Sequence, residues 1–212
     1  MSEQPTKDTT IHTERRRERR NLLAQLFVAL LVGLACQEMV QVAWDSLRHD
    51  GLTLGTIVLG GTFLLTALRF FIGVQFHIID PDLLAMRGSV WFYDFLVIVL
   101  EMLILTLLAG VTTLPANLDS VVRFPALFAC LLGLDVVWIV SQWAFGRLFR
   151  SCARRTIPWP WAWINTGLLL ILGILWLARV DLLSPPSLIV LGLSNLAAFA
   201  IDVFLVDKAG LA

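Results

Sequence analysis

Asp94 and Glu101 stand seven residues apart in an apolar segment, 91–101, that reads WFYDFLVIVLE. Seven residues make two helical turns, so both carboxylates lie on one face of a helix, ~10 Å apart along its axis. A carboxylate in a membrane-length helix is expensive and usually faces a protein interior or water. The two residues are therefore candidates for binding a proton or a small cation inside a membrane protein.

Four other apolar segments carry polar residues at the same seven-residue spacing, namely Glu38 and Asp45, Thr62 and Arg69, Asp135 and Gln142, and Asn195 and Asp202. Each pair shares one helix face, and contact with lipid would leave these groups without hydrogen-bond partners. We therefore expect the five faces to converge in the interior, joined by Asn165 from a further segment. A rise of ~1.5 Å per residue predicts two layers. The midplane layer holds Glu101, Asp135 and Asn195, the cytoplasmic layer holds Asp94, Gln142, Asn165, Asp202 and Arg69, and Glu38 lies alone near the outer side.

Arg69 is the only basic residue in the spans proper, since Arg123 and Arg179 stand at span ends. We predict that it pairs with Asp94, with Glu101 as the second choice, because a buried guanidinium is best satisfied by a carboxylate. This pairing leaves an acidic surplus that includes Asp135 and Asp202. Carboxyl groups buried without a cation can take up and release protons. The alternative interpretation is a static hydrogen-bonded network that fixes helix packing.

The composition indicates a membrane protein. The chain is 58% hydrophobic with a mean hydropathy of +0.82, whereas soluble domains are roughly 45–50% apolar. We predict an all-α fold, with one domain of six transmembrane helices over residues 21–206. A polar, basic segment (1–20) precedes this domain and a short tail (207–212) follows it. The six spans are predicted near 21–43, 52–76, 90–112, 121–146, 160–181 and 187–206, each of them long enough to cross the hydrocarbon.

The distribution of Lys and Arg predicts the orientation. With the N-terminus inside, the inner segments carry 12 of the 16 basic residues and the outer segments carry Arg48, Arg123 and Arg179. Positive charge is retained on the cytoplasmic side of membranes. Both termini are therefore expected to be cytoplasmic, and we predict a protein of the bacterial inner membrane.

Two basic clusters lie on this inner side and are expected to contact anionic lipid or a cytoplasmic protein partner. They consist of Arg15, Arg16, Arg17, Arg19 and Arg20, and of Arg147, Arg150, Arg154 and Arg155. No nucleic-acid partner is expected, because the formal net charge is zero. A six-helix bundle of this size also makes a homo-oligomer plausible, since copies could enclose a pore together.

Catalytic chemistry has little support in the sequence. His77 is expected at the inner mouth beside Asp80 and Asp82. An interfacial turn explains this group of residues more simply than a metal site does. We predict no metal, no cofactor and no catalytic residue.

Two short stretches resemble the paired motifs of intramembrane aspartyl proteases, namely Tyr93-Asp94 and Gly133-Leu134-Asp135. The resemblance covers only these residues. Both glycine positions of that family's second motif are Leu here (132 and 134), and Pro125-Ala126-Leu127 precedes Asp135 instead of following it. An intramembrane hydrolase is accordingly the most remote of the functions considered.

The favoured function is a channel or transporter for protons or a small cation, which uses the buried carboxylates. The alternative is a membrane anchor or sensor subunit of a larger complex, which transports nothing and binds its partner through the basic segments. The substrate, the gating and the stoichiometry do not follow from the sequence.

Overall fold

The computed structural model describes residues 7–49, 54–79, 88–111, 118–148, 159–178, 181–182 and 184–208, and every regular element among them is helical. The helices are α1 (Lys7–His49), α2 (Leu54–Ile79), α4 (Gly88–Val111), α5 (Leu118–Leu148), α6 (Trp159–Leu177) and α7 (Pro185–Lys208). Each contains a segment long and apolar enough to cross a membrane. The prediction of an all-α fold with six membrane-length helices is confirmed.

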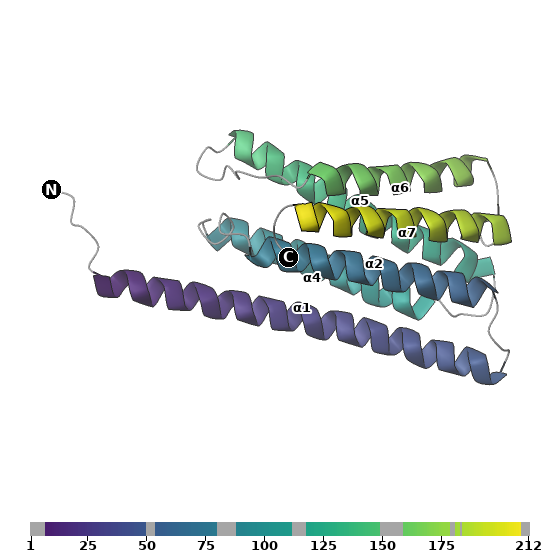
Figure 1. Ribbon diagram of the computed structural model, residues 1–212, viewed down its shortest axis with the longest axis horizontal. Helices are drawn as coiled ribbons and strands as arrows, with labels where there is room; N and C mark the ends of the chain where they lie inside the picture. Colours follow the sequence, from purple (N-terminus) through teal and green to yellow (C-terminus); the bar gives the residue numbers. More distant parts are fainter. Residues whose placement is uncertain are drawn as a thin grey trace.

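The helices run alternately up and down along one long axis (Figure 1). We call the end at which α1 begins and α7 finishes the terminal end, and the opposite end, at Pro185, the far end. Helix α1 projects well beyond the other helices at the terminal end (Figure 1). Its 43 residues correspond to ~64 Å, about twice the thickness of the hydrocarbon core.

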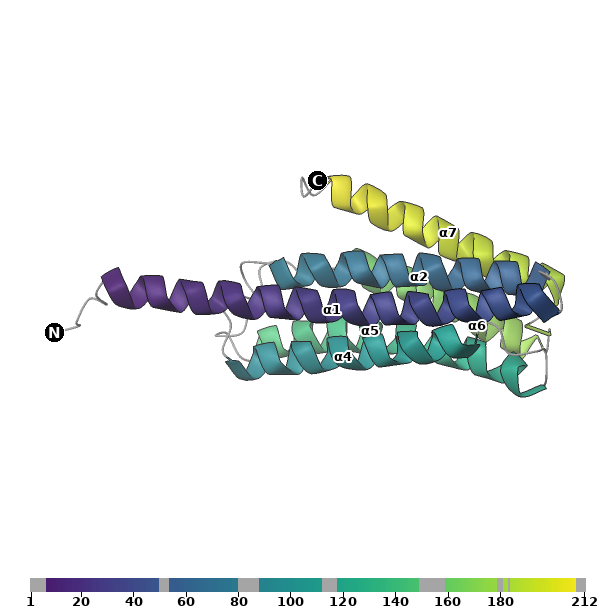
Figure 2. The same ribbon diagram turned by 90° about the horizontal axis from the view of Figure 1, so that it is seen from below.

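Neighbouring helices pack through one continuous apolar core that includes Val28, Phe63, Leu105, Phe128 and Leu131, all fully buried. Helix α1 lies against α2 and α4, α5 lies against α4 and α6, and α7 lies against α2. Figure 2 shows α7 close to α2 at the far end and diverging from it toward the terminal end. Because lipid is as apolar as leucine, this packing is held by close contact and hydrogen bonds and owes nothing to exclusion of water.

Candidate functional site

Twelve polar or charged side chains are buried among the residues that the structure describes: Thr62, Thr66, Arg69, His77, Asp94, Glu101, Asp135, Gln142, Asn165, Ser187, Asn195 and Asp202. Eight of them are interior site residues expected from the sequence, and a further one, His77, was expected at the inner mouth. Their helices are α2, α4, α5, α6 and α7. The structure therefore brings together the polar faces of five helices.

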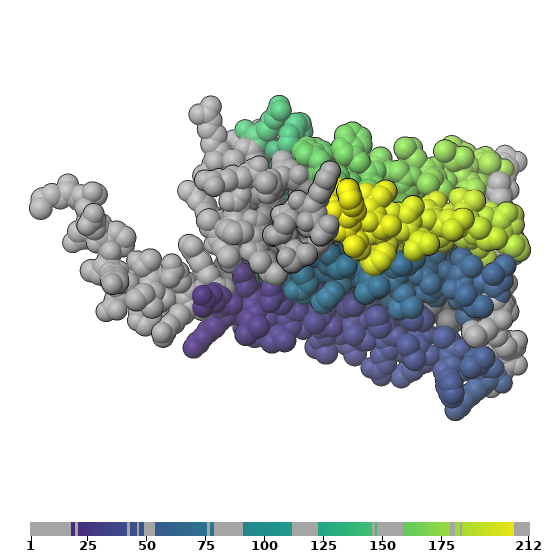
Figure 3. Space-filling view, in the orientation of Figure 1, coloured from purple at the N-terminus to yellow at the C-terminus, as the bar shows by residue number. Residues whose placement is uncertain are grey.

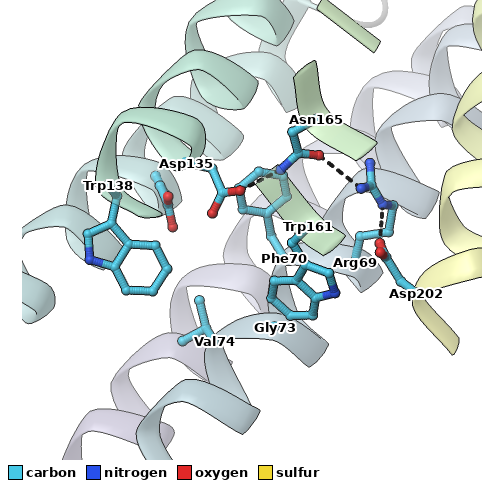
Figure 4. A pocket seen from close by; sticks show the side chains of 10 residues that line it. Arg69, Phe70, Gly73, Val74, Asp135, Trp138, Trp161, Asn165 and Asp202 are labelled. Carbon is cyan, nitrogen blue, oxygen red and sulfur yellow. Dashed lines mark hydrogen bonds and ion pairs between the residues drawn. The ribbon is translucent and has the colours of Figure 1, made fainter. Parts of the chain in front are cut away.

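Arg69 is the centre of this arrangement. Its Nε lies 2.5 Å from Asp202 Oδ2, and its two terminal nitrogens donate to Asn165 Oδ1 at 2.9 Å and to Asn195 Oδ1 at 3.3 Å. The guanidinium is 4% exposed and lies between Asn165 and Asp202 (Figure 4). One side chain from α2 is thus bonded to both α6 and α7. We call Arg69, Asp202, Asn165, Asn195 and Asp135 the Arg69 network.

The predicted pairing of Arg69 with Asp94 is wrong, and so is the second choice, Glu101. Helix α2 packs against α7, and Arg69 on α2 forms its ion pair with Asp202 on α7. The planar fork of donors on a long side chain lets Arg69 bond to α6 and α7 at once. Asp94 is instead bonded to side chains of α5.

Asn195 lies at the edge of the Arg69 network, where it bonds to two residues of α2. Its amide nitrogen donates to the Thr62 carbonyl at 2.8 Å and to Thr66 Oγ1 at 2.9 Å. These two bonds turn its amide oxygen toward Arg69, at 3.3 Å. Thr66 in turn donates to the Thr62 carbonyl at 2.7 Å. The amide of Asn195, which is buried between α2 and α7, therefore has hydrogen-bond partners on both its nitrogen and its oxygen. A buried amide requires such partners.

Asn165 carries the network from the cation to a second acid. Its amide oxygen accepts from Arg69, and its amide nitrogen donates to Asp135 Oδ2 at 2.5 Å. The order Asp202, Arg69, Asn165, Asp135 is visible in Figure 4. An amide carries both an acceptor and a donor, so Asn165 can accept from the guanidinium and donate to the carboxylate at once.

A small cavity lies beside this chain of bonds. It is lined by Arg69, Glu101, Asp135 and Asp202 together with the rings of Phe70, Trp138 and Trp161. The cavity has a volume of about 20 Å³, which is room for about one water molecule. Glu101 is 1% exposed, and its Oε1 has no hydrogen-bond partner among the described residues. Glu101 and Asp135 both line this cavity.

Trp161 closes one wall of the cavity by lying over Gly73. A Cβ at position 73 would stand 1.9 Å from a ring carbon of Trp161, so only glycine fits beneath this indole (Figure 4). Gly73 stands one helical turn beyond Arg69 on the same face of α2. The contact between the Trp161 ring of α6 and the backbone of α2 therefore lies directly beside the buried cation.

A second group of polar side chains, the Asp94 cluster, lies nearer the terminal end. Asp94 Oδ1 accepts from Trp138 Nε1 at 3.0 Å and from the Gln142 amide nitrogen. His77 Nε2 lies 3.4 Å from Asp94 Oδ2, and the imidazole packs edge-on against Trp138 with ring centroids 4.5 Å apart. His77 is 6% exposed, so it lies inside the protein rather than at an open inner mouth, because α4 and α5 cover this part of α2.

Trp138 joins the two groups and was not expected from the sequence. Its indole lines the cavity beside Asp135 and also donates to Asp94. The signal was present, since Trp138 lies between Asp135 and Gln142 at intervals of three and four residues, on the same helix face. Tyr93 and Ser141 extend the Asp94 cluster: their hydroxyls are 2.8 Å apart, and Ser141 also donates to the Trp138 carbonyl.

The predicted separation into two layers is wrong in detail. Asn165 and Arg69, assigned to the cytoplasmic layer, bond directly to Asp135 and Asn195, which were assigned to the midplane. Long side chains reach along the bundle axis, so counting residues along a helix misplaces their polar ends. The polar groups are divided instead between the Arg69 network and the Asp94 cluster.

Glu38 and Asp45 on α1 were expected to face the interior, and both side chains are exposed instead. Glu38 lines a groove between α1 and α4. Helix α1 buries a narrow stripe that includes Ala24, Val28, Ala35 and Met39, and position 38 falls beside this stripe. The polar face of α1 therefore does not join the other five.

The basic residues proposed for lipid or partner contact are only partly visible. Arg19 and Arg147 are exposed, and Arg147 lies over the ring of Trp143, 4.7 Å from its centroid. Arg15, Arg16, Arg17 and Arg20 belong to α1, but their side chains lie outside the described residues. Arg150, Arg154 and Arg155 also lie outside the described residues, as do Asp80 and Asp82.

The two aspartates of the protease-like motifs belong to different groups. Asp135 lines the cavity and is bonded to Asn165, whereas Asp94 is bonded to Trp138 and Gln142 and is not among the residues lining that cavity. A proteolytic pair needs two aspartates that share one proton. Comparisons with protein-family models, with curated proteins and with solved structures found no match for this chain.

Proposed function

We propose that this protein is an integral membrane transporter or channel for protons or a small cation, with Glu101 and Asp135 as the binding groups. The observation that carries the proposal is the composition of the cavity wall, which holds three carboxyl groups and one guanidinium. Arg69 is paired with Asp202. Two acids therefore remain beside a space the size of a water molecule, and intramembrane ionisable groups are functional candidates by default.

Of the two cargoes, the proton is the better supported. The space of about 20 Å³ holds about one water, so few oxygen ligands other than the two carboxyl groups can surround a metal cation. Arg69 already supplies a positive charge at this site and would repel a second one. A proton needs only the two carboxyl groups and the single water. Among the residues that the structure describes, no donor bonds to the buried Glu101 Oε1 to hold it in the ionised form.

The route to the site is proposed to start at the terminal end. His77, Asp94 and Gln142 lie on this side of the cavity, and Trp138 connects them to it. The interior toward the far end holds buried apolar residues, among them Leu105, Leu108 and Phe128. Transport would then require a second conformation in which this apolar layer opens, as in alternating access.

The orientation in the membrane is part of the same proposal. Both chain ends lie toward the terminal end (Figure 1), and most of the Lys and Arg residues fall in the segments on that side. By the positive-inside rule the terminal end would be cytoplasmic. Placement in a bacterial inner membrane is proposed with it.

Proton flux into liposomes tests the function. The purified chain, reconstituted with a pH-sensitive dye inside the vesicles, should conduct protons when a potential is applied. Glu101→Gln and Asp135→Asn should each abolish this flux while the protein remains folded. Glu38→Gln is the matched control, because Glu38 is also a membrane-embedded acid but lies outside the cavity. Unchanged flux in both cavity variants would remove these residues from the mechanism.

A second function is favoured by one specific observation, the projection of α1 beyond the other helices (Figure 1). This projection carries the basic segment 14–20. A helix that extends past the membrane offers a binding surface to a soluble partner, so the chain could be a subunit that transports nothing. Charge reversal across Arg15–Arg20 should then release a cytoplasmic protein, and no flux should be seen with the unmodified chain.

A further inference from the structure

The outward face of α1 carries polar groups at a depth where lipid offers no partner for them. Gln37 and Glu38 are both exposed and lie eight and seven residues from Asp45, where the apolar span of α1 ends. That is a depth of about 10–12 Å, which is within the hydrocarbon of a bilayer. An amide with no hydrogen-bond partner in such a medium costs about 4–8 kcal/mol relative to water.

The surroundings of Gln37 form a helix-binding surface. Leu26, Leu30, Gly33, Gln37, Val40 and Trp44 are all exposed and are separated by alternating steps of four and three residues. This is the spacing of a seam between two helices, with one amide among apolar residues. Gly33 stands one turn from Gln37, and nothing lies within 4 Å of the position of its absent Cβ. Small residues at such positions let helix backbones approach closely.

A groove adjoins this surface. It lies between α1 and α4, has a volume of about 480 Å³, and is lined by Gln37, Glu38, Thr106 and Gly110 among others. Helix α1 lies along one edge of the molecule and is not covered there by another helix of the chain (Figures 1 and 3). The span of α1 is also the least buried of the six.

We propose that the outward face of α1 binds a second copy of this chain, so that two α1 helices pack side by side about a two-fold axis centred near Gln37. The choice of occupant follows from complementarity. Around Gln37 the exposed polar groups are one acid, Glu38, and the amides of Gln37 and Gln41, so the partner must bring hydrogen-bond donors. Gln37 carries a donor and an acceptor, and two such amides facing each other across a two-fold axis satisfy one another. The second amide hydrogen of each can reach Glu38 of the other copy, which is a charge-assisted bond.

Energy transfer between two labelled populations of the full chain, reconstituted together in liposomes, tests this proposal. The unmodified chain should dimerise more than random mixing predicts at the same protein-to-lipid ratio. Gln37→Leu should weaken dimerisation about 3- to 30-fold, as expected for the loss of interhelical hydrogen bonds in a membrane. Gly33→Ile should abolish it, because the added side chain blocks the close approach.

The matched control is Gly167→Ile. Gly167 lies on α6, also with nothing within 4 Å of its absent Cβ, so both glycine variants add the same bulk at a position where the first added carbon meets no other atom of the chain. Dimerisation equal to the unmodified chain in Gly167→Ile, together with loss in Gly33→Ile, supports the proposal. Random mixing of the unmodified chain, or an equal loss in both glycine variants, would overturn it.

Disulfide trapping provides a second readout that identifies the occupant. In a chain with its three cysteines replaced by serine, Gly33→Cys should form a dimer of the chain under mild oxidation. Leu170→Cys, at an exposed position of α6, should not. Equal trapping at both positions, or trapping of position 33 only to a different protein of the membrane, would overturn the proposal that the occupant is a second copy.

Discussion

The two halves of the helix bundle differ in what holds the helices together. In the half toward the terminal end, side chains on five helices are joined by the Arg69 network and the Asp94 cluster. In the half toward the far end, the interior is formed mainly by fully buried apolar residues such as Phe63, Leu108, Phe124 and Phe128. Inside a membrane apolar packing is weakly selective, because a leucine meets the same surroundings in lipid as in protein. The hydrogen bonds of the terminal half therefore specify which helices meet, while the apolar half seals the bundle.

Arg69→Met is expected to cause the largest loss of stability, because it removes the centre of the Arg69 network. This change leaves Asp202 buried without its cation and removes a donor from both Asn165 and Asn195. Stranding a buried charge destabilises by about 3–5 kcal/mol. The measurement is the free energy of unfolding in mixed micelles titrated with a denaturing detergent.

The double variant Arg69→Met with Asp202→Leu is the control for this prediction. It removes both charges, so it should be more stable than Arg69→Met alone. A double variant as unstable as the single one would show that Asp202 is not the partner on which the stability of Arg69 depends.

Phe128→Ala tests the apolar half. The ring is fully buried, and its removal should cost about 3 kcal/mol through lost contacts and a residual cavity. Proton flux through the unopened protein should not rise, since apolar cavities remain dry. Leu103→Ala on the lipid-facing side of α4, where the side chain is 50% exposed, should change the stability much less. A large rise in flux with Phe128→Ala would mean that water already reaches this half.

Gly73→Ala tests the contact of the Trp161 ring with α2 next to the cavity. The new methyl group would overlap the Trp161 ring, and overpacking of this kind costs about 1–3 kcal/mol. Trp161→Leu added to the same chain should recover part of the loss. Gly61→Ala on the same helix, where no atom lies within 4 Å of the added group, should leave the stability unchanged or slightly higher.

The smallest effect is expected from Tyr93→Phe at the edge of the Asp94 cluster. It removes the hydrogen bond to Ser141, which is 2.8 Å long and partly buried, and should cost about 0.5–1.5 kcal/mol. Ser141 keeps its bond to the Trp138 carbonyl, so no buried group is stranded. If Tyr93→Phe lowered the free energy of unfolding as much as Arg69→Met does, the Arg69 network would not be the stronger of the two polar groups.

The sequence alone was enough to predict the six membrane-length helices and the burial of nearly all the interior polar residues. Both follow from local rules, namely the length of an apolar run and the cost of polar groups in lipid. The partner of Arg69 could not be predicted in the same way, because it depends on which helices are neighbours. The contact of α2 with α7 joins residues 133 positions apart, and nothing in either segment alone specifies that contact.

The misplacement of Glu38 has a different physical origin. The rule that polar faces turn inward holds for a helix surrounded by its own chain, but α1 has only one covered side. Its outward face follows the same rule only if a second protein covers it. The role of Gly73 was also missed, since the need for a glycine comes from the ring of Trp161, which approaches from another helix.

The central claim is that Glu101 and Asp135 hold an exchangeable proton inside the bundle. Infrared difference spectroscopy of the full chain in liposomes, recorded as the pH is changed, observes the carboxyl stretch of protonated side chains directly. We predict a buried carboxyl band that appears and disappears with pH and that is removed by Glu101→Gln or Asp135→Asn, but not by Glu38→Gln. A spectrum in which these two substitutions change nothing would contradict the account.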